Sequence, residues 1–206
     1  MHLPARWRTV ASATTAALAA IALSAGSAAA DAGPSPGGCP DVPTGQPFSP
    51  WQDFADYFLA PDGDFEAGAS SWQLEDGAAV VEGNEPFVGA AGDHRSLRLP
   101  AGASATSAPM CIGEEHRTMR FVAMSTDASP LRVEALYTKH NGQRKSVTLG
   151  NVRGTDAWAP SDVLAMRVNE DAGEYGDAMS VSLRFSARGN ATWQIDGVHV
   201  DPFRTK

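Results

Sequence analysis

Hydrophobic and polar residues alternate along much of the chain after residue 70. In residues 131–138 the apolar side chains occupy every second position, with Arg132 and Glu134 between them. Residues 180–185 repeat the pattern. A period of two is typical of strands with one buried and one solvated face. Since Gly, Pro, Asn and Asp separate such runs, the pattern predicts nine strands, at 72–74, 78–83, 95–99, 117–125, 130–138, 144–149, 162–168, 178–187 and 192–200.

Local deviations refine this prediction. Asn141-Gly142 is a residue pair suited to a type I′ hairpin turn. Residues 121–124 are all apolar, as expected for a central strand covered on both faces. The alternation slips at Asp196-Gly197, which predicts a β-bulge. Residues 51–59 fit a helical turn or an irregular strand. The whole pattern predicts an all-β fold, a two-sheet antiparallel β-sandwich.

The first thirty residues have the features of a secretory signal peptide. Arg6 and Arg8 form a basic start, residues 10–23 are apolar and uncharged, and the Ala residues at 28–30 offer a cleavage site. A membrane anchor is the alternative, but this apolar run is shorter than the roughly 20 residues that span a bilayer. We therefore expect residues 1–30 to be removed and the protein to be secreted into an extracellular compartment.

Length and composition favour one folded domain after the signal peptide. The chain has 206 residues, of which 43% are hydrophobic, 20 are Gly and 14 are Pro, in line with a loop-rich β protein. Residues 31–47 concentrate Pro and Gly, so we expect an irregular segment there. The β-sandwich is then expected over residues 48–206.

The charge balance narrows the class of partner. The chain has 16 Lys and Arg against 24 Asp and Glu, a net charge of −8, and removal of residues 1–30 with their two Arg brings it to −10. Nucleic acids and anionic membranes are bound through clusters of Lys and Arg, to which Arg144-Lys145 is the nearest approach. The sequence argues against nucleic acid, and against a membrane after signal cleavage.

Two cysteines, Cys39 and Cys111, remain after the predicted cleavage. In an exported protein a single pair predicts one disulfide, which here would fasten the N-terminal segment to the sandwich. A reactive thiol or a metal-binding pair is the alternative. Either would need further reactive groups or ligands nearby, and only His116 is close in sequence.

Three short motifs stand out from the strand pattern. Residues 62–66 read D-G-D-F-E and are followed by Trp72, Ser96-Leu97 lies in the next long strand, and residues 193–200 read W-Q-I-D-G-V-H-V. They resemble the G-D-F-E…W opening, the S-L strand and the I-D-D-V closing strand of carbohydrate-binding modules with the galactose-binding-like jelly-roll fold. Here Gly197 replaces the second Asp. The chain is also similar to exported bacterial proteins that share P-F-S-P-W, G-D-F-E and I-D-G-V-x-V-D-P-F.

The resemblance implies a jelly-roll β-sandwich with a structural Ca²⁺ beside its first and last strands. Calcium takes several oxygen ligands. The carboxylates of Glu66 and Asp196, together with carbonyl oxygens of Asp64 and of the Arg95 neighbourhood, are the candidate ligands. The alternative is that Asp64 and Glu66 cap a turn and face solvent.

The resemblance also implies a carbohydrate ligand, which needs aromatic platforms and polar groups on an exposed face. The candidate residues are Trp158, His94, Phe87 and Tyr175. Trp158 is favoured because the loop 154–160 could present its ring to solvent. For each aromatic residue the alternative is a place in the core, most of all for Trp72 and Trp193, which are not among the candidates.

Enzyme motifs are absent from the sequence. It contains neither G-x-S-x-G nor H-E-x-x-H, and no glycine-rich phosphate loop. A glycoside hydrolase, which needs only two carboxylates, is the enzymatic alternative, with Glu114, Glu115 or Asp162 as candidates. We expect a monomeric, non-catalytic binding protein for carbohydrate. The alternative is an exported or cell-envelope protein with a structural or protein-interaction role and no sugar site.

Overall fold

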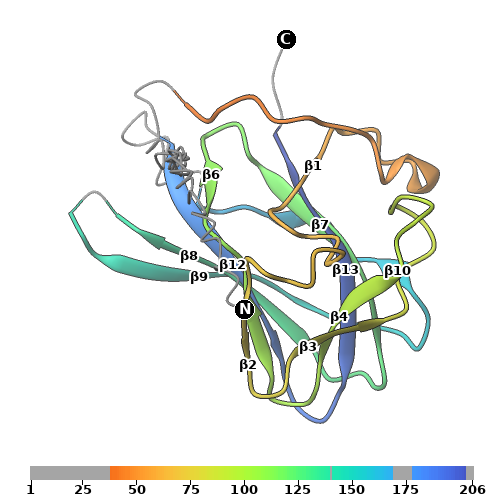
Figure 1. Cartoon of the computed structure of the whole chain (residues 1–206). Coiled ribbons are helices and arrows are strands. Elements are labelled where there is room, and N and C mark those ends of the chain that lie inside the picture. Colours follow the sequence, from red (N-terminus) through yellow and green to blue (C-terminus); the bar gives the residue numbers. More distant parts are fainter. Residues whose placement is uncertain (1–37, 140, 169–177, 203–206) are drawn as a thin grey trace, which may run out of the picture. The chain divides into compact units, whose positions relative to one another are not determined.

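The computed structural model describes residues 38–139, 141–168 and 178–202, which belong to one compact unit, residues 33–206. The predicted signal peptide lies outside the described residues. None of the helices in the described ranges is long and apolar enough to cross a membrane. The elements are η1 (Ser49–Trp51), β1 (Phe58–Leu59), β2 (Gln73–Glu75), β3 (Ala79–Glu82), β4 (Arg95–Leu99), β5 (Ser104–Thr106), β6 (Met110–Ile112), β7 (Thr118–Ser125), β8 (Leu131–Thr138), β9 (Arg144–Val152), β10 (Ala159–Pro160), β11 (Leu164–Ala165), β12 (Met179–Ala187) and β13 (Trp193–Asp201) (Figure 1).

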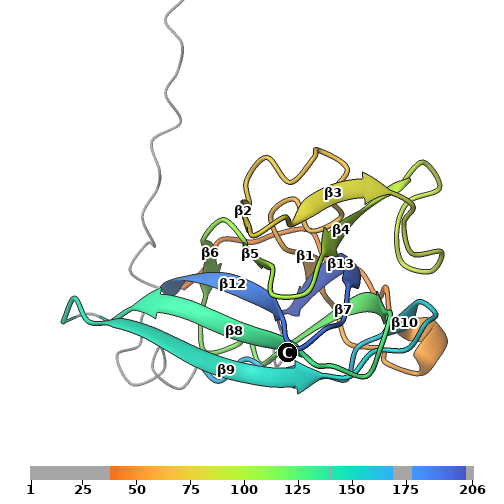
Figure 2. The ribbon, with the colours of Figure 1, turned by 90° about the horizontal axis from the view of Figure 1, so that it is seen from below.

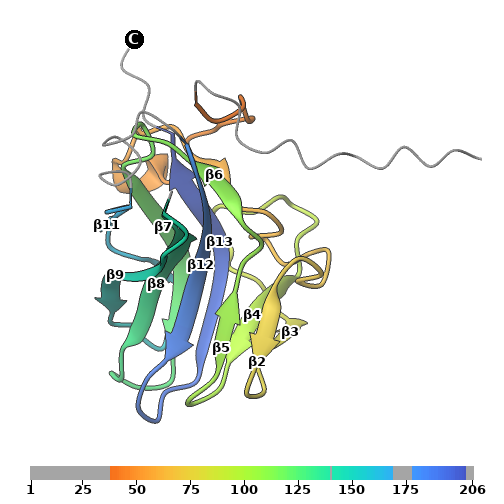
Figure 3. The ribbon, with the colours of Figure 1, turned by 90° about the vertical axis from the view of Figure 1, so that its left-hand side faces the viewer.

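The strands form two antiparallel sheets, so the predicted β-sandwich is confirmed. A seven-stranded sheet has the order β10-β7-β13-β4-β3, with β1 also paired to β13 and β11 to β7. A six-stranded sheet has the order β2-β5-β12-β8-β9, with β6 also paired to β12. Figure 2 shows β12, β8 and β9 together in one layer, and in Figure 3 the strands of the six-stranded sheet run side by side.

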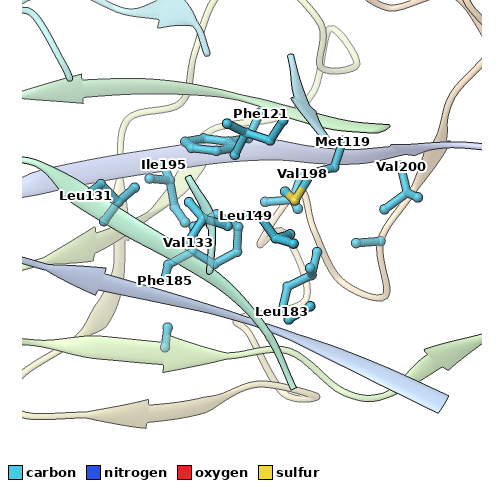
Figure 4. Close-up of a cluster of buried hydrophobic side chains, with 14 of the residues drawn as sticks. Met119, Phe121, Leu131, Val133, Leu149, Leu183, Phe185, Ile195, Val198 and Val200 are labelled. Atoms are coloured by element: carbon cyan, nitrogen blue, oxygen red, sulfur yellow. The ribbon is translucent and has the colours of Figure 1, made fainter. Parts of the chain in front are cut away.

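The alternation in the sequence places the core between the sheets. Val181, Leu183 and Phe185 of β12 are fully buried. Figure 4 shows Leu183 and Phe185 in one cluster with Ile195 of β13. The ring of Phe121, from the opposite sheet, meets Phe185 edge to face at 5.2 Å, a favoured aromatic geometry. Trp72 and Trp193 are also buried here, 7% and 0% exposed, which confirms the core alternative for both.

The sequence pattern predicted the long strands and two of the short ones, β2 and β11, and missed three others. Strands β5, β6 and β10 have two or three residues each, too few to show a period of two. The segment 51–59 divides between the end of η1 and strand β1, so both expectations for it apply in part. Strand β7 is buried on both faces, as predicted, and the register of β13 shifts between Asp196 and His199, which confirms the bulge.

The predicted β8–β9 hairpin is present. The Lys139 N–H donates a hydrogen bond to the Gln143 carbonyl, and the Gly142 N–H donates one to the Lys139 carbonyl. Gly142 has a positive φ of 79°, as the second central residue of a type I′ turn requires. His140 lies outside the described residues, so the turn type stays a prediction.

The N-terminal segment crosses the outer face of the seven-stranded sheet. Phe48, Tyr57 and Val122 form a second buried cluster there, and the Arg120 guanidinium lies 4.7 Å from the centroid of the Phe48 ring. A disulfide joins Cys39 to Cys111 next to Ile112, with 5.5 Å between the Cα atoms, so the predicted bridge is confirmed.

Candidate functional site

The outer faces of the two sheets differ in what covers them. On the seven-stranded sheet, Asp196 points away from the core and is still only 4% exposed, because the loop 83–94 between β3 and β4 lies over it. On the six-stranded sheet the outward side chains of β12 remain accessible, with Ser180 exposed and Ser182 and Arg184 half-buried. Each face holds one candidate site.

The first site is a carboxylate pocket of about 220 Å³ beneath the loop 83–94. Its polar lining consists mainly of four acidic residues from three parts of the chain: Asp64, Glu85, Asp93 and Asp196. The Glu85 carboxylate accepts hydrogen bonds from the backbone N–H groups of Val88 and Gly89, which shapes the loop. The Asp196 carboxylate accepts the Glu85 N–H at 3.2 Å and so ties the loop to β13.

Burial changes the acidity of two of these groups. Desolvation raises the pKa of Asp196 to about 8, against the lowering effect of the backbone N–H groups of Glu85 and Gly197. Desolvation also raises the pKa of Asp64, with the charges of Asp93 and Asp62 acting in the same direction. A pocket that disfavours several nearby negative charges would gain from a proton or a cation.

Asp62, which directly precedes the G-D-F-E segment at residues 63–66, has an unusual environment. Both of its carboxylate oxygens are buried and have no hydrogen-bond partner among the described residues. A buried carboxylate without a partner is costly, and a cation would satisfy it. Asp62 is therefore a further acidic residue beside the pocket that was not among the predicted metal ligands.

The four predicted metal residues fall into two groups. Asp64 and Asp196 line the carboxylate pocket. The Glu66 carboxylate instead accepts the backbone N–H groups of His94 (2.9 Å) and Arg95 (2.7 Å), and Arg95 Nη1 donates to the Glu66 carbonyl. Burial acts to raise the pKa of Glu66, but these two N–H groups and the charges of His94 and Arg95 hold it below its ordinary value.

Among the described residues, one group of three possible metal ligands has its ligand atoms close together, and it lies outside the carboxylate pocket. Ligand atoms of Cys39, Glu115 and His116 lie within 4.8 Å of one another. Because Cys39 is bonded to Cys111, its sulfur is not a thiolate and this group is not a metal site while the disulfide is intact. Glu115 is also one of the candidate glycosidase carboxylates, and its Oε1 lies 3.3 Å from His116 Nδ1.

Two of the predicted ligand residues, Trp158 and Phe87, lie on the loop-covered side of the sandwich. Trp158 is half-buried against the cluster of Phe48, Tyr57 and Val122. Phe87 is 47% exposed and its ring packs edge to face on Trp51 at 5.2 Å.

The other two predicted ligand residues are His94 and Tyr175. The His94 ring is exposed and lies 3.2 Å from Glu66. Tyr175 lies outside the described residues. A sugar-binding role for these four residues stays a prediction.

The second site is a groove of about 560 Å³ on the outer face of the six-stranded sheet, across β12, β8 and β9. Alternate residues of neighbouring strands project on the same side of a sheet, and most of the groove is built in this way. It is lined by Leu136, Tyr137, Thr138, Arg144, Lys145, Ser146, Ser180, Ser182 and Arg184.

A hydrogen-bonded network borders this groove. The Glu134 carboxylate accepts the Ser146 hydroxyl at 3.0 Å and pairs with Arg132 at 3.2 Å, and Arg132 also donates to Thr148. In the next strand Arg184 Nε lies 3.3 Å from the Thr106 hydroxyl oxygen, to which it donates. The sequence did not predict a site on this face, because most of its side chains are small or charged and belong to strands rather than loops.

The fold resembles that of solved carbohydrate-binding modules. One is the CBM22-1–CBM22-2 tandem domain of Xyn10C from Paenibacillus barcinonensis, with a TM-score of 0.51 and 15% identity over 73% of this chain and 46% of that chain. Another is the CBM22-1–GH10 part of Clostridium thermocellum xylanase 10B, solved with xylohexaose, with a TM-score of 0.51 and 9% identity over 68% of this chain and 27% of that chain.

These identities establish the fold alone. The chain spans less than half of either structure, so neither whole protein is a guide to its activity. The single CBM22-1 xylan-binding domain from Paenibacillus barcinonensis is matched over 99% of its length, with 16% identity and a TM-score of 0.48. No protein-family model matches the sequence, and no curated protein matches it either.

Proposed function

We propose that this protein is an exported, monomeric, non-catalytic carbohydrate-binding module, with its glycan in the groove across β12, β8 and β9. The observation that carries the proposal is this groove, which is open and polar and lies on the face that neither the N-terminal segment nor the loop 83–94 covers. The similarity in fold to carbohydrate-binding modules supports it.

The lining of the groove suits a polyol. Ser146, Ser180 and Ser182 carry hydroxyl groups that both donate and accept hydrogen bonds, as sugar hydroxyls do. The groove lies on rigid strands, so these groups are held in place before the ligand binds, which lowers the entropic cost of association. Among the described residues that line it there is no Asp or Glu, and a two-carboxylate hydrolytic mechanism therefore has no groups there.

We also propose that the carboxylate pocket holds a structural calcium ion. Asp196 would supply a carboxylate oxygen, as the sequence predicted, and Asp64 would supply its carboxylate rather than the predicted carbonyl oxygen. Glu85 and Asp93 line the same pocket. The two buried, unpartnered oxygens of Asp62 fit the presence of a cation close by. Calcium would supply a counter-charge for these groups and hold the loop 83–94 against β13. The Glu66 carboxylate would not bind the metal but would hold the start of β4 through the hydrogen bonds that it accepts from the His94 and Arg95 N–H groups.

A glycan array followed by affinity electrophoresis tests the binding function. Ser182→Trp should fill the groove and abolish binding, and Ser180→Trp, at an exposed position, provides a second blocking variant if the first is unstable. Phe87→Ala should retain binding, because Phe87 lies in the loop 83–94, away from the groove, and packs on Trp51. Loss of binding only in Phe87→Ala would move the site to the aromatic side. Absence of binding across a broad panel would favour the structural or protein-interaction role.

A further inference from the structure

The groove differs in charge from the rest of the protein. The chain carries a net charge of −8, with 24 acidic residues. Three of its basic residues, Arg144, Lys145 and Arg184, line this groove, and within the described part of the chain no acidic residue lines it. A concentration of positive charge in an acidic protein requires an explanation beyond solubility.

We propose that the groove selects an anionic glycan, specifically a polysaccharide that carries carboxylate groups, as uronic acid residues do. This inference rests on the proposed carbohydrate-binding function and adds the chemical class of the ligand. Arg184 and Arg144 would bind the carboxylates, and the serine hydroxyls would bind the sugar hydroxyls.

The arginine side chains are available for this role. Within the described ranges neither Arg144 nor Arg184 forms an ion pair, and the nearby Glu134 is already paired with Arg132 at 3.2 Å. Arg184 is held in position by its hydrogen bond to Thr106. An arriving carboxylate would thus meet a guanidinium group without breaking an internal ion pair, and a guanidinium can bind a carboxylate with two parallel hydrogen bonds.

The described lining of the groove offers no ring face of the kind on which neutral sugars stack. Among the described residues that line it, Tyr137 is the one aromatic residue; it is 6% exposed and belongs to the core between the sheets. Leu136 is half-buried. With this described lining, affinity would come mainly from charge-assisted hydrogen bonds, which are stronger than those between neutral groups.

The positions of the two arginines favour a polymer over a single sugar. Arg184 lies opposite Glu134, and Arg144 lies opposite Thr138, four residues further along β8. Strands β12 and β9 flank β8, so the two Cα atoms are separated by about 10 Å across the sheet and about 13 Å along it. A separation of this size lets the two arginines contact different residues of a polymer.

Affinity electrophoresis of the purified protein with four polymers tests the inference. Polygalacturonate and alginate carry carboxylates, dextran sulfate carries sulfate esters, and galactan is neutral. We expect retardation by the two uronate polymers, little by galactan, and weaker binding as NaCl is raised. Arg184→Gln and Arg144→Gln should each weaken uronate binding by about 10-fold or more. Arg98→Gln changes an exposed arginine on β4 of the other sheet and should leave it unchanged.

The other outcomes separate the two proposals. Binding of galactan as strong as that of the uronates would overturn the anionic inference and leave the carbohydrate function intact. Equal binding of dextran sulfate and the uronates would overturn selectivity for carboxylates. Equal weakening by Arg98→Gln would show a diffuse charge effect and would also overturn the assignment. Binding to none of the four polymers, nor to a wider glycan panel, would defeat both proposals.

Discussion

Val88 packs directly on Gly197, so that a Cβ atom placed on Gly197 would lie 2.7 Å from Val88 Cγ2. Gly197 also has a positive φ of 54° at the bulge in β13, a conformation that glycine adopts without strain. The loop 83–94 can therefore close over Asp196 because residue 197 has no side chain. A second Asp at position 197, as in the I-D-D-V closing strand that this strand resembles, would therefore clash with Val88.

Replacing Gly197 should destabilise the protein. Gly197→Ala combines left-handed strain with a clash against Val88, and we expect the free energy of unfolding to fall by about 2 to 4 kcal/mol. Chemical denaturation measures this. Gly92→Ala is a matched control in the same loop, since Gly92 has open space around its Cα and no positive φ, and it should be close to neutral.

A double variant separates the two causes. In Val88→Ala/Gly197→Ala the clash is removed while the backbone strain remains, so part of the loss should be recovered relative to the sum of the single variants. Additive effects of the two substitutions would show that Val88 does not press on residue 197.

The disulfide should contribute substantially to stability. It closes a loop of 72 residues between Cys39 and Cys111, and in the chain-entropy model its removal costs on the order of 4 kcal/mol. Cys39→Ser/Cys111→Ser should melt well below the wild type under oxidising conditions. Adding a reductant should lower the wild-type melting temperature to that of the variant and leave the variant unchanged. A wild type that melts at the same temperature with and without reductant would contradict this role.

The sequence was most informative where one face of a strand is buried. The alternation around Val133 and Val181 predicted β8 and β12 because burying one face imposes a period of two. The bulge at Asp196 was visible for the same reason, as a break in that period. Strand β5 was not predicted, since three residues cannot show a period, and its pairing is decided by neighbours distant in sequence.

The candidate sites depend more on tertiary structure. Asp64 and Asp196 were found through short motifs, yet the presence of Glu85 beside them follows from the closure of a loop 111 residues before Asp196. Arg184 was not singled out because an arginine on the solvated face of a strand is ordinary. Only the sheet order, which places β8 between β12 and β9, brings it into one groove with Arg144.

Trp158 should act in stability rather than in sugar binding. It packs half-buried against Phe48, Tyr57 and Val122, so Trp158→Ala should lower the free energy of unfolding by about 1 to 3 kcal/mol. Glycan binding should be retained at temperatures where the variant is folded. Thermal melting and affinity electrophoresis measure the two effects separately. Loss of affinity with an unchanged melting temperature would place the glycan on the loop-covered side instead.

Asp196 should make stability depend on pH when no metal is bound. Its pKa is about 8 in the folded protein and about 3.9 when unfolded, so the folded state holds the proton more tightly. The resulting stabilisation is fully present below pH 4 and is lost as the pH rises through 8. The Asn side chain of Asp196→Asn cannot ionise. In EDTA, the melting temperature of this variant relative to that of the wild type should therefore rise as the pH increases from 4 to 9.

Calcium should reverse this ranking at high pH. Metal binding needs the deprotonated carboxylate, so calcium should raise the melting temperature of the wild type, increasingly so toward pH 9, and should not raise that of Asp196→Asn. Asp156→Asn, at an exposed carboxylate outside the pocket, should respond to calcium and pH as the wild type does. A calcium response that persists in Asp196→Asn would remove Asp196 from the metal site. A wild-type melting temperature that neither calcium nor EDTA changes would rule out a structural ion. The pH dependence measured in EDTA tests the buried Asp196 carboxylate independently of that result.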